Sequence, residues 1–284
     1  MEKGKPSPTA ERVALRRAAH QLLDDPKILD DPVALRIIGR EEASALCADP
    51  RRSETSRISP YLRAFVAARS RYAEDELALG VRRGVHQYVI LGAGLDTFAY
   101  RNPHPETELR VFEVDHPATQ TWKRQRLQEA GILLPGNLTF APIDLETQTL
   151  EDGLKEAGYD PGKRTFFSWL GVTEYLTVGS VTATLRFIAS AAEGSGVVFD
   201  YMISPSLLAP AHRSVFDAFA RRVASAGEPW QTFFDPDLLT RDLRAMGFRH
   251  VDDQGPAEIN SRYFKDRKDG LKVGSLSHLM NAQV

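Results

Sequence analysis

One stretch, residues 87–115, constrains the fold more than any other part of the chain. A short apolar, β-branched run ends in Gly92-Ala93-Gly94, and a second apolar run ends in Asp115, 21 to 23 residues after the two glycines. A strand, a glycine turn, a helix start and a second strand closed by a carboxylate form one nucleotide-binding half of a doubly wound α/β fold. Glycine suits the turn because a Cβ would block close approach of a ligand to the backbone. A carboxylate at this spacing can accept hydrogen bonds from a ribose diol.

The same geometry serves two classes of cofactor, and position 97 separates them. Dinucleotide-binding folds have a third glycine three residues after the second, where the helix packs on the strand beneath a pyrophosphate. In this chain that position is Thr97. The turn therefore favours a nucleoside without a diphosphate, such as S-adenosyl-L-methionine. An ordinary tight connection can also carry Gly-x-Gly, so the interpretation depends on the pairing with Asp115.

Composition excludes several other classes of protein. Hydrophobic residues make up 42% of the 284 positions, which is enough for a substantial core, and the net charge of −2 disfavours a nucleic-acid partner. Cys47 is the only cysteine, so neither an intramolecular disulfide nor a cysteine-based metal cluster is possible, and we expect no metal. Apolar runs are too short to span a bilayer, and the polar N-terminus lacks a signal core. We therefore expect a cytoplasmic protein without a membrane partner.

Strand and helix patterns divide the chain into two parts. Residues 1–84 are predicted to form an N-terminal helical cap, with residues 1–8 disordered. Residues 85–284 are predicted to form the cofactor-binding domain, with a lid insertion around residues 203–234. The strands expected there are residues 88–91, 109–115, 138–143, 164–170, 197–202, 248–252 and 261–264, followed by a tail from residue 270. Strands that alternate with helices indicate a parallel α/β sheet, and the closing strand pair predicts one antiparallel strand at an edge.

Polar residues near strand ends are the candidates for binding and catalysis. Asp144 is either a helix cap or a contact to an adenine amine. His116 is either part of a turn or a catalytic residue. Tyr175 and Tyr201 could orient a substrate, or be packed rings with tethered hydroxyls. Arg69 could hold a ligand carboxylate with its bidentate guanidinium, or be a surface charge. No residue is identified as an indispensable base, so the catalytic residue is left unassigned.

Two further groups have a plain structural interpretation. The basic residues of the helix after residue 116 are expected to face solvent: Lys123, Arg124 and Arg126. The aromatic residues after the lid are interpreted as core rather than as a substrate wall: Trp230, Phe233 and Phe234.

Taken together, the motifs resemble those of the leucine carboxyl methyltransferase family, and most closely its bacterial branch of S-adenosyl-L-methionine-dependent methyltransferases. The resemblance is carried by Ala68-Arg69, Val89–Thr97 with Arg101, Phe112–Pro117, Asp144-Leu145 and Gly171–Leu176, and it is good over roughly residues 60–205. It implies a class I methyltransferase-like Rossmann fold, with a mostly parallel seven-stranded sheet and an N-terminal helical cap.

The family also implies contacts to each moiety of the cofactor. Arg69 would bind the methionine carboxylate, and Asp115 would take the ribose hydroxyls with Glu113 beside it. The turn backbone would lie against methionine and ribose (Gly92, Ala93, Gly94), and the adenine would meet Asp144 and Leu145. The chain departs from the family where Leu170-Gly171 replaces a common Glu-Gly pair, so an acidic contact near the methyl donor is expected to be absent.

These observations favour a methyltransferase of the EC 2.1.1 class that acts on a carboxyl or hydroxyl group of a small-molecule acceptor. One alternative is an NAD(P)-dependent Rossmann oxidoreductase, which Thr97 and the lack of a Tyr-x-x-x-Lys pair argue against. The other alternative is a non-catalytic cofactor-binding protein. The sequence leaves open the acceptor and whether the protein is a monomer or a homodimer.

Overall fold

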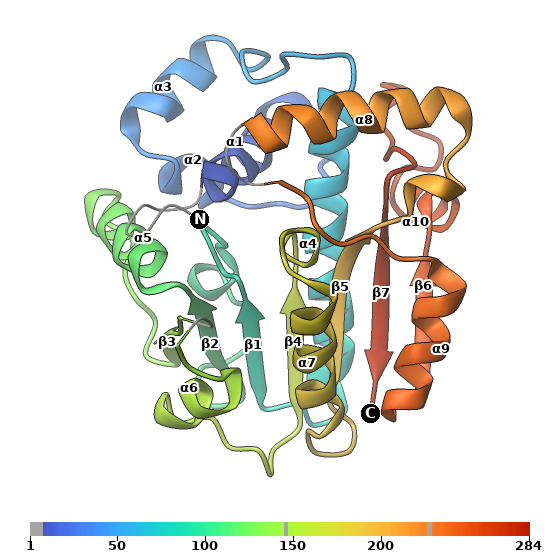
Figure 1. Ribbon diagram of the computed structural model, residues 1–284. Helices are drawn as coiled ribbons and strands as arrows, with labels where there is room; N and C mark the ends of the chain where they lie inside the picture. Colours follow the sequence, from blue (N-terminus) through green and yellow to red (C-terminus); the bar gives the residue numbers. More distant parts are fainter. Residues whose placement is uncertain (1–7, 145–146, 226–228) are drawn as a thin grey trace.

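The computed structural model describes residues 8–144, 147–225 and 229–284, and Figure 1 shows a central sheet between helices. The strands are Gln87–Leu91 (β1), Arg110–Asp115 (β2), Leu138–Pro142 (β3), Thr165–Trp169 (β4), Gly196–Met202 (β5), His250–Gln254 (β6) and Ser277–Gln283 (β7). Their order in the sheet is β3-β2-β1-β4-β5-β7-β6. Strands β1 to β5 pair in parallel, and β7 is antiparallel to both β5 and β6. The predicted mostly parallel, seven-stranded sheet is confirmed.

Helices cover both faces of this sheet. The helices are Pro8–Leu23 (α1), Ala34–Ile37 (α2), Arg40–Ala48 (α3), Ser59–Arg82 (α4), Pro117–Glu129 (α5), Leu150–Glu156 (α6), Val178–Ala189 (α7), Pro210–Ser225 (α8), Pro236–Met246 (α9) and Pro256–Tyr263 (α10). Short 3-10 turns are Phe98–Tyr100 (η1), Thr173–Tyr175 (η2) and Pro205–Leu207 (η3). Among these helices, none is long and apolar enough to cross a membrane.

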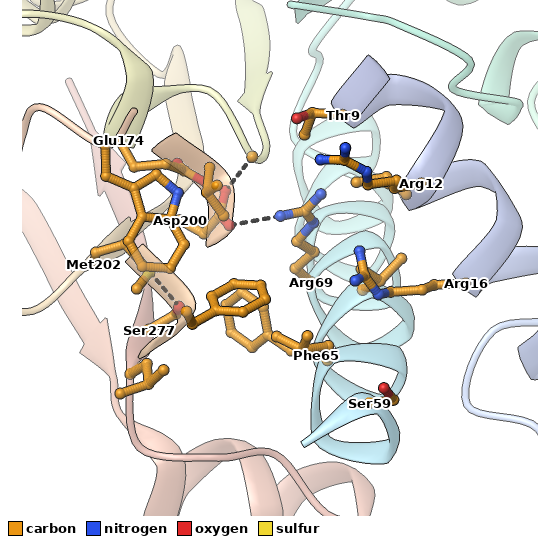
Figure 2. A pocket seen from close by; sticks show the side chains of 18 of the residues that line it. Thr9, Arg12, Arg16, Ser59, Phe65, Arg69, Glu174, Asp200, Met202 and Ser277 are labelled. Atoms are coloured by element: carbon orange, nitrogen blue, oxygen red, sulfur yellow. Dashed lines mark hydrogen bonds and ion pairs between the residues drawn. The ribbon is translucent and has the colours of Figure 1, made fainter. Parts of the chain in front are cut away.

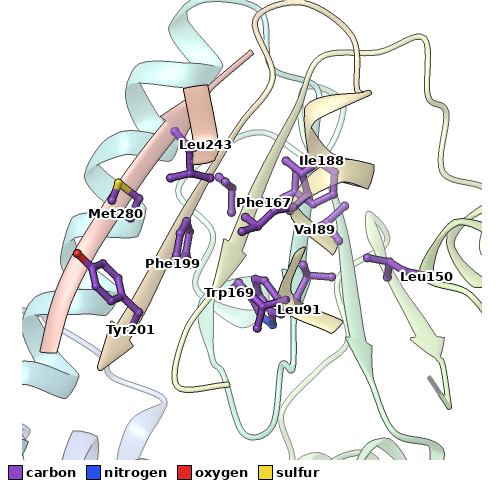
Figure 3. Close-up of a cluster of buried hydrophobic side chains, with 14 of the residues drawn as sticks. Val89, Leu91, Leu150, Phe167, Trp169, Ile188, Phe199, Tyr201, Leu243 and Met280 are labelled. Carbon is purple, nitrogen blue, oxygen red and sulfur yellow. The ribbon is translucent and has the colours of Figure 1, made fainter. Parts of the chain in front are cut away.

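The sheet is buried on both faces because alternate residues of each strand point to opposite sides. In β1, Val89 and Leu91 pack into one core cluster with α6, α7 and α9, which Figure 3 shows around Phe167 and Phe199. The side chain of Tyr88 packs instead into the core cluster on the other face of the sheet, which contains residues of α4 and α10. Burial of each large apolar side chain stabilises the fold by about 1.5–3 kcal/mol. This two-sided burial explains the continuous apolar runs of the parallel strands.

The end of the chain differs from the prediction. Residues 261–263 belong to α10, and the last strand is β7, in a segment predicted to be a tail. Moreover, the antiparallel strand does not lie at an edge, because β7 is inserted between β5 and β6. The β7 sequence is poor in β-branched residues. Pairing on both sides and burial of Leu279 and Met280 therefore outweigh its weak local propensity.

The turn after β1 is tighter than predicted. Only the short 3-10 turn η1 follows the glycines, where a helix start was expected. Thr97 is fully buried, and its hydroxyl donates a hydrogen bond to Asp31 Oδ2 at 2.6 Å. The segment therefore provides no long helix whose N-terminus could receive a pyrophosphate, which agrees with the choice of a nucleoside at this position.

The residues ahead of the sheet form helices α1 to α4, in the region predicted to be a cap. Within this region, α2 and α3 are separated at Gly39, where φ is +91°. Helix α4 also packs into the sheet core through Leu77. The cap boundary at residue 84 remains a prediction, and the segment predicted to be disordered lies, apart from Pro8, outside the described residues.

Short polar side chains cap two of the helices. Asp235 caps α9, and α9 ends before Gly247, whose φ is +112°. Thr177 caps α7, since the Ser180 N–H donates to the Thr177 hydroxyl. Lys123 does not face solvent as expected but is 1% exposed.

Candidate active site

A cavity of about 570 Å³ lies at the carboxyl ends of β1, β2 and β4. This is the point where the strand order reverses, and ligands of open α/β sheets bind there. The volume falls within the roughly 300–1,000 Å³ typical of small-molecule sites. Helix α1 closes one side of this larger cavity, and the sheet lines the other. Its lining includes these residues predicted to bind the cofactor: Arg69, Gly92, Ala93, Gly94, Asp115 and Asp144.

The glycine turn and Asp115 form one hydrogen-bonded unit. Gly92 and Gly94 have φ angles of +66° and +46°, a region that favours glycine. The Gly94 N–H donates to Asp115 Oδ2 at 2.6 Å, and the His116 N–H donates to Oδ1 at 2.7 Å. Burial raises the pKa of the Asp115 carboxyl, although these two backbone donors act in the opposite direction. The carboxylate is thus held at the cavity wall with a defined orientation.

Glu113 is not at the cavity, so the structure corrects its predicted place beside the cofactor. Its side chain is fully buried and forms an ion pair with Lys123 Nζ at 2.7 Å, which explains why Lys123 is buried. The Tyr100 hydroxyl lies 3.3 Å from the same carboxylate. Burial raises the pKa of Glu113 to about 7 despite the ammonium group. The pair fixes α5 against β2 and leaves Glu113 no access to a ligand.

A second cavity, of about 180 Å³, adjoins the first. Arg69, Gly171 and Tyr175 line both cavities, so this group marks their junction. The wall of the smaller cavity is mainly apolar, and its polar side chains include acidic and basic groups that Figure 2 shows on opposite sides. Its apolar lining includes Leu62, Phe65, Val66, Met202, Phe219, Val223, Trp230 and Leu276. Trp230 is therefore a wall residue as well as a packing residue.

At the junction, Arg69 already has an acidic partner. Its Nη1 donates to Asp200 Oδ2 at 2.8 Å, and Asp200 Oδ1 accepts from the Gly171 N–H at 2.5 Å. Gly171 has φ of +72°, and a Cβ there would lie 2.6–3.0 Å from the Arg69 guanidinium. Glycine is needed at this position because any side chain would displace Arg69. Arg69 is thus a buried residue of the site and not a surface charge.

The two candidate tyrosines have different surroundings. Tyr175 lies at the junction of the cavities. Tyr201 does not line either cavity: its ring is 1% exposed in the core shown in Figure 3, and its hydroxyl donates to Asp253 at 2.7 Å. The structure therefore agrees with the alternative interpretation of Tyr201, a packed ring with a tethered hydroxyl, and not with a role in orienting a substrate.

Of three other candidate residues, His116 and Asp144 line the larger cavity, and Leu145 lies outside the described residues. His116 lines the larger cavity, but its Nδ1 accepts a hydrogen bond from the Ala118 N–H at 3.1 Å and caps α5. Asp144 also lines that cavity, and its carbonyl accepts from the Thr147 and Gln148 N–H groups. Leu145 lies outside the described residues.

Sequence reasoning missed two carboxylates, Glu174 and Asp200. Both line the smaller cavity. Glu174 is 9% exposed, and its Oε2 has no hydrogen-bond partner in the described part of the chain. The available signal was position, since each acid lies at or just beyond the carboxyl end of a predicted strand.

Strand order, glycine turn and cavity position define a class I methyltransferase-like fold, and comparisons with known proteins identify the family. The family model for leucine carboxyl methyltransferase matches residues 10–189, and the chain belongs to this family. It is 33% identical to the Bacillus subtilis protein named "Putative S-adenosyl-L-methionine-dependent methyltransferase YktD", over 99% of both chains. A similarly named Mycolicibacterium smegmatis protein is 32% identical over 81% of this chain and 76% of its own.

A solved structure supports the fold independently. The crystal structure of a Thermobifida fusca protein described as a "putative methyltransferase" aligns with a TM-score of 0.55 at 17% identity, over 99% of this chain and 96% of that chain. The predictions of family, fold class, methyltransferase activity and S-adenosyl-L-methionine as cofactor are confirmed.

Proposed function

We propose that this protein transfers a methyl group from S-adenosyl-L-methionine to an oxygen atom of a small molecule. The observation that carries the proposal is the pair of adjoining cavities. The larger one has the glycine turn and a strand-end carboxylate, and the smaller one is largely apolar. A nucleoside donor in the first cavity and an apolar acceptor in the second would meet at Arg69, Gly171 and Tyr175.

The residues of the larger cavity suit this donor chemically. Asp115 offers carboxylate oxygens for a ribose diol, and Asp144, which lines the same cavity, would contact the adenine. Arg69 would bind the methionine carboxylate with those N–H groups of its guanidinium that do not donate to Asp200. The carboxylate needs such a partner because an unpaired buried charge is costly. When bound, the donor supplies an electrophilic methyl group on a sulfonium.

Methyl transfer of this kind depends mainly on placement. An acceptor oxygen held in line with the methyl group in a water-poor pocket can gain about 7–11 kcal/mol from proximity and orientation. The apolar wall around Phe65, Met202 and Trp230 would exclude water and hold the body of the acceptor. A small organic molecule fits this cavity better than a protein carboxyl terminus, because helix α1 and the segment near Trp230 contribute to its lining.

Calorimetry tests the donor half of the proposal. We expect S-adenosylhomocysteine to bind to the wild-type protein and NADPH not to bind. Incubation with a methyl-labelled donor and a metabolite extract should then yield labelled, alkali-stable or alkali-labile small molecules, according to whether an ether or an ester forms. Tight NADPH binding without S-adenosylhomocysteine binding would instead favour an oxidoreductase. Donor binding without labelled product would favour a non-catalytic protein.

A further inference from the structure

The smaller cavity contains a buried acid with one unpartnered carboxyl oxygen. Glu174 Oε2 lacks a hydrogen-bond partner in the described residues, and Trp230 Nε1, in the lining of the same cavity, is a second buried polar atom without one. Unpartnered buried polar atoms are rare because each costs about 1–3 kcal/mol. A ligand that donates a hydrogen bond to Glu174 would remove part of this cost.

The backbone holds Glu174 firmly in place. The Glu174 carbonyl accepts a hydrogen bond from the Gln231 N–H at 2.7 Å, and the neighbouring Thr173 hydroxyl donates to the Asp200 carbonyl at 2.7 Å. The 3-10 turn η2 is thus tied to β5 on one side and to residues 231–232 on the other. Figure 2 shows Glu174 and Asp200 together on one side of the cavity, facing Arg69.

We propose that Glu174 is a catalytic residue that accepts the proton of an acceptor hydroxyl, and that the acceptor is an apolar phenol or enol rather than a carboxylic acid. This inference rests on the proposed function. A substrate carboxylate at the junction would meet two acids, Glu174 and Asp200, because Arg69 is paired with Asp200 and, in the proposed function, also holds the methionine carboxylate. A hydroxyl, in contrast, can donate to Glu174 while a lone pair faces the methyl group.

The step moves one proton to Glu174 and one methyl group to the substrate oxygen. The substrate O–H proton passes to the Glu174 carboxylate as the substrate oxygen bonds to the methyl carbon. The carbon–sulfur bond breaks, and its electron pair returns to sulfur, giving an uncharged thioether. The products are a methyl ether, S-adenosylhomocysteine and a protonated Glu174. No further co-reactant is needed.

The electrostatic surroundings match a phenol. Burial, and then the charge of Asp200, raise the pKa of Glu174 to about 8, while Arg69 acts in the opposite direction. A phenol has a pKa near 10, so such a base is much better matched to a phenol than to an aliphatic alcohol. Among the described residues, the other charged and titratable groups around this cavity are Asp200 from β5, Arg69 from α4, Arg12 and Arg16 from α1, and Tyr175 from η2. The volume of about 180 Å³ exceeds the roughly 150 Å³ that holds benzene, and a second ring could extend toward the larger cavity at the junction.

The test compares two probes with the same ring system, 2-naphthol and 2-naphthoate, with labelled donor. We expect the wild-type enzyme to methylate 2-naphthol and to leave 2-naphthoate unchanged. In Glu174→Gln, kcat for 2-naphthol should fall about 10²- to 10⁴-fold. Because the base acts in its deprotonated form, the wild-type kcat/KM should rise as pH increases through about 8, and the variant should lose this rise.

Controls separate this inference from folding and from the proposed function. Glu193→Gln makes the same chemical change at an exposed carboxylate and should leave kcat unchanged. Glu174→Gln should keep its thermal midpoint and its affinity for S-adenosylhomocysteine, because the cavity stays filled and a buried charge is removed. Methylation of 2-naphthoate, absence of 2-naphthol binding, or full activity of Glu174→Gln would each overturn the inference while donor binding persists. If the wild-type protein does not bind S-adenosylhomocysteine, the proposed function itself is wrong.

Discussion

At the scale of single residues, two neighbouring carboxylates on β2 have opposite roles. Asp115 ends the strand at the larger cavity, where backbone N–H groups orient it. Glu113, two residues earlier, lies under α5 and is neutralised by Lys123. A shift of two positions along a strand therefore changes a cavity-lining group into a structural one, because burial and partners differ.

Asp115→Asn tests the binding role with little change of shape. The amide oxygen can still accept from one of the two backbone N–H groups, but the amide nitrogen cannot accept from the other, and the charge that strengthens hydrogen bonds to ribose hydroxyls is lost. Such bonds contribute about 1.5–3 kcal/mol. We expect affinity for S-adenosylhomocysteine to fall about tenfold to a hundredfold in calorimetry. Glu129→Gln, at the end of α5, is the control and should bind like the wild type. An unchanged affinity in Asp115→Asn would remove the ribose assignment.

At the scale of secondary-structure elements, the Glu113–Lys123 pair decides how α5 sits on the sheet. Because the folded pKa of Glu113 is about 7, above its usual 4.5, the folded state retains the proton more tightly, and this group lowers stability as pH rises between those values. Lys123→Met leaves the carboxylate unpaired, which should cost about 3–5 kcal/mol at pH 8 in urea unfolding and less at pH 5. Adding Glu113→Gln should recover most of the loss. Equal stability of Lys123→Met and wild type at pH 8 would contradict this account.

The connection after β4 makes a second prediction for an element. Gly171→Ala introduces a Cβ against the Arg69 guanidinium as well as an unfavourable positive φ. Gly131→Ala is a matched control, since Gly131 has φ of +62° but no atom within 4 Å of the added Cβ. The control should lose about 1–2 kcal/mol from backbone strain alone. Gly171→Ala should lose more and should also bind S-adenosylhomocysteine less well. Equal losses in the two variants would show that the contact with Arg69 is unimportant.

At the scale of the whole molecule, the N-terminal helices are joined to the glycine turn by buried ionic groups. Arg17 in α1 pairs with Asp31 at 2.9 Å and donates to the Leu95 carbonyl, while Asp31 also accepts from Thr97. In Figure 1, α1 lies at the end of the sheet where the parallel strands terminate. The same contacts therefore close the larger cavity and couple its turn to the N-terminal region.

Arg17→Met should weaken this coupling. We expect chymotrypsin to cleave within residues 8–60 sooner in the variant, and S-adenosylhomocysteine to protect this segment in the wild type but much less in Arg17→Met. Arg52→Met changes an exposed arginine in the same region and should behave like the wild type. If ligand fails to alter cleavage in any of the three proteins, the N-terminal helices do not close over the site.

The sequence by itself determined the central half of the fold and the cofactor class. Strand periodicity, the glycines at positive φ and the carboxylate after β2 are local requirements, so they can be read from neighbouring residues. The same local logic identified Thr97 as unsuited to a pyrophosphate turn and placed Arg69 among the candidates.

Only the tertiary structure decided the position of β7, the pairing of Glu113 with Lys123, and the meeting of Glu174, Asp200 and Arg69. These features join segments from 10 to more than 100 residues apart, as with the 131 positions between Arg69 and Asp200. Burial and charge pairing at such separations depend on how the helices and sheet pack, which local patterns do not encode. For this reason the cofactor class could be predicted from sequence, whereas the smaller cavity and its buried acid emerged from the packing.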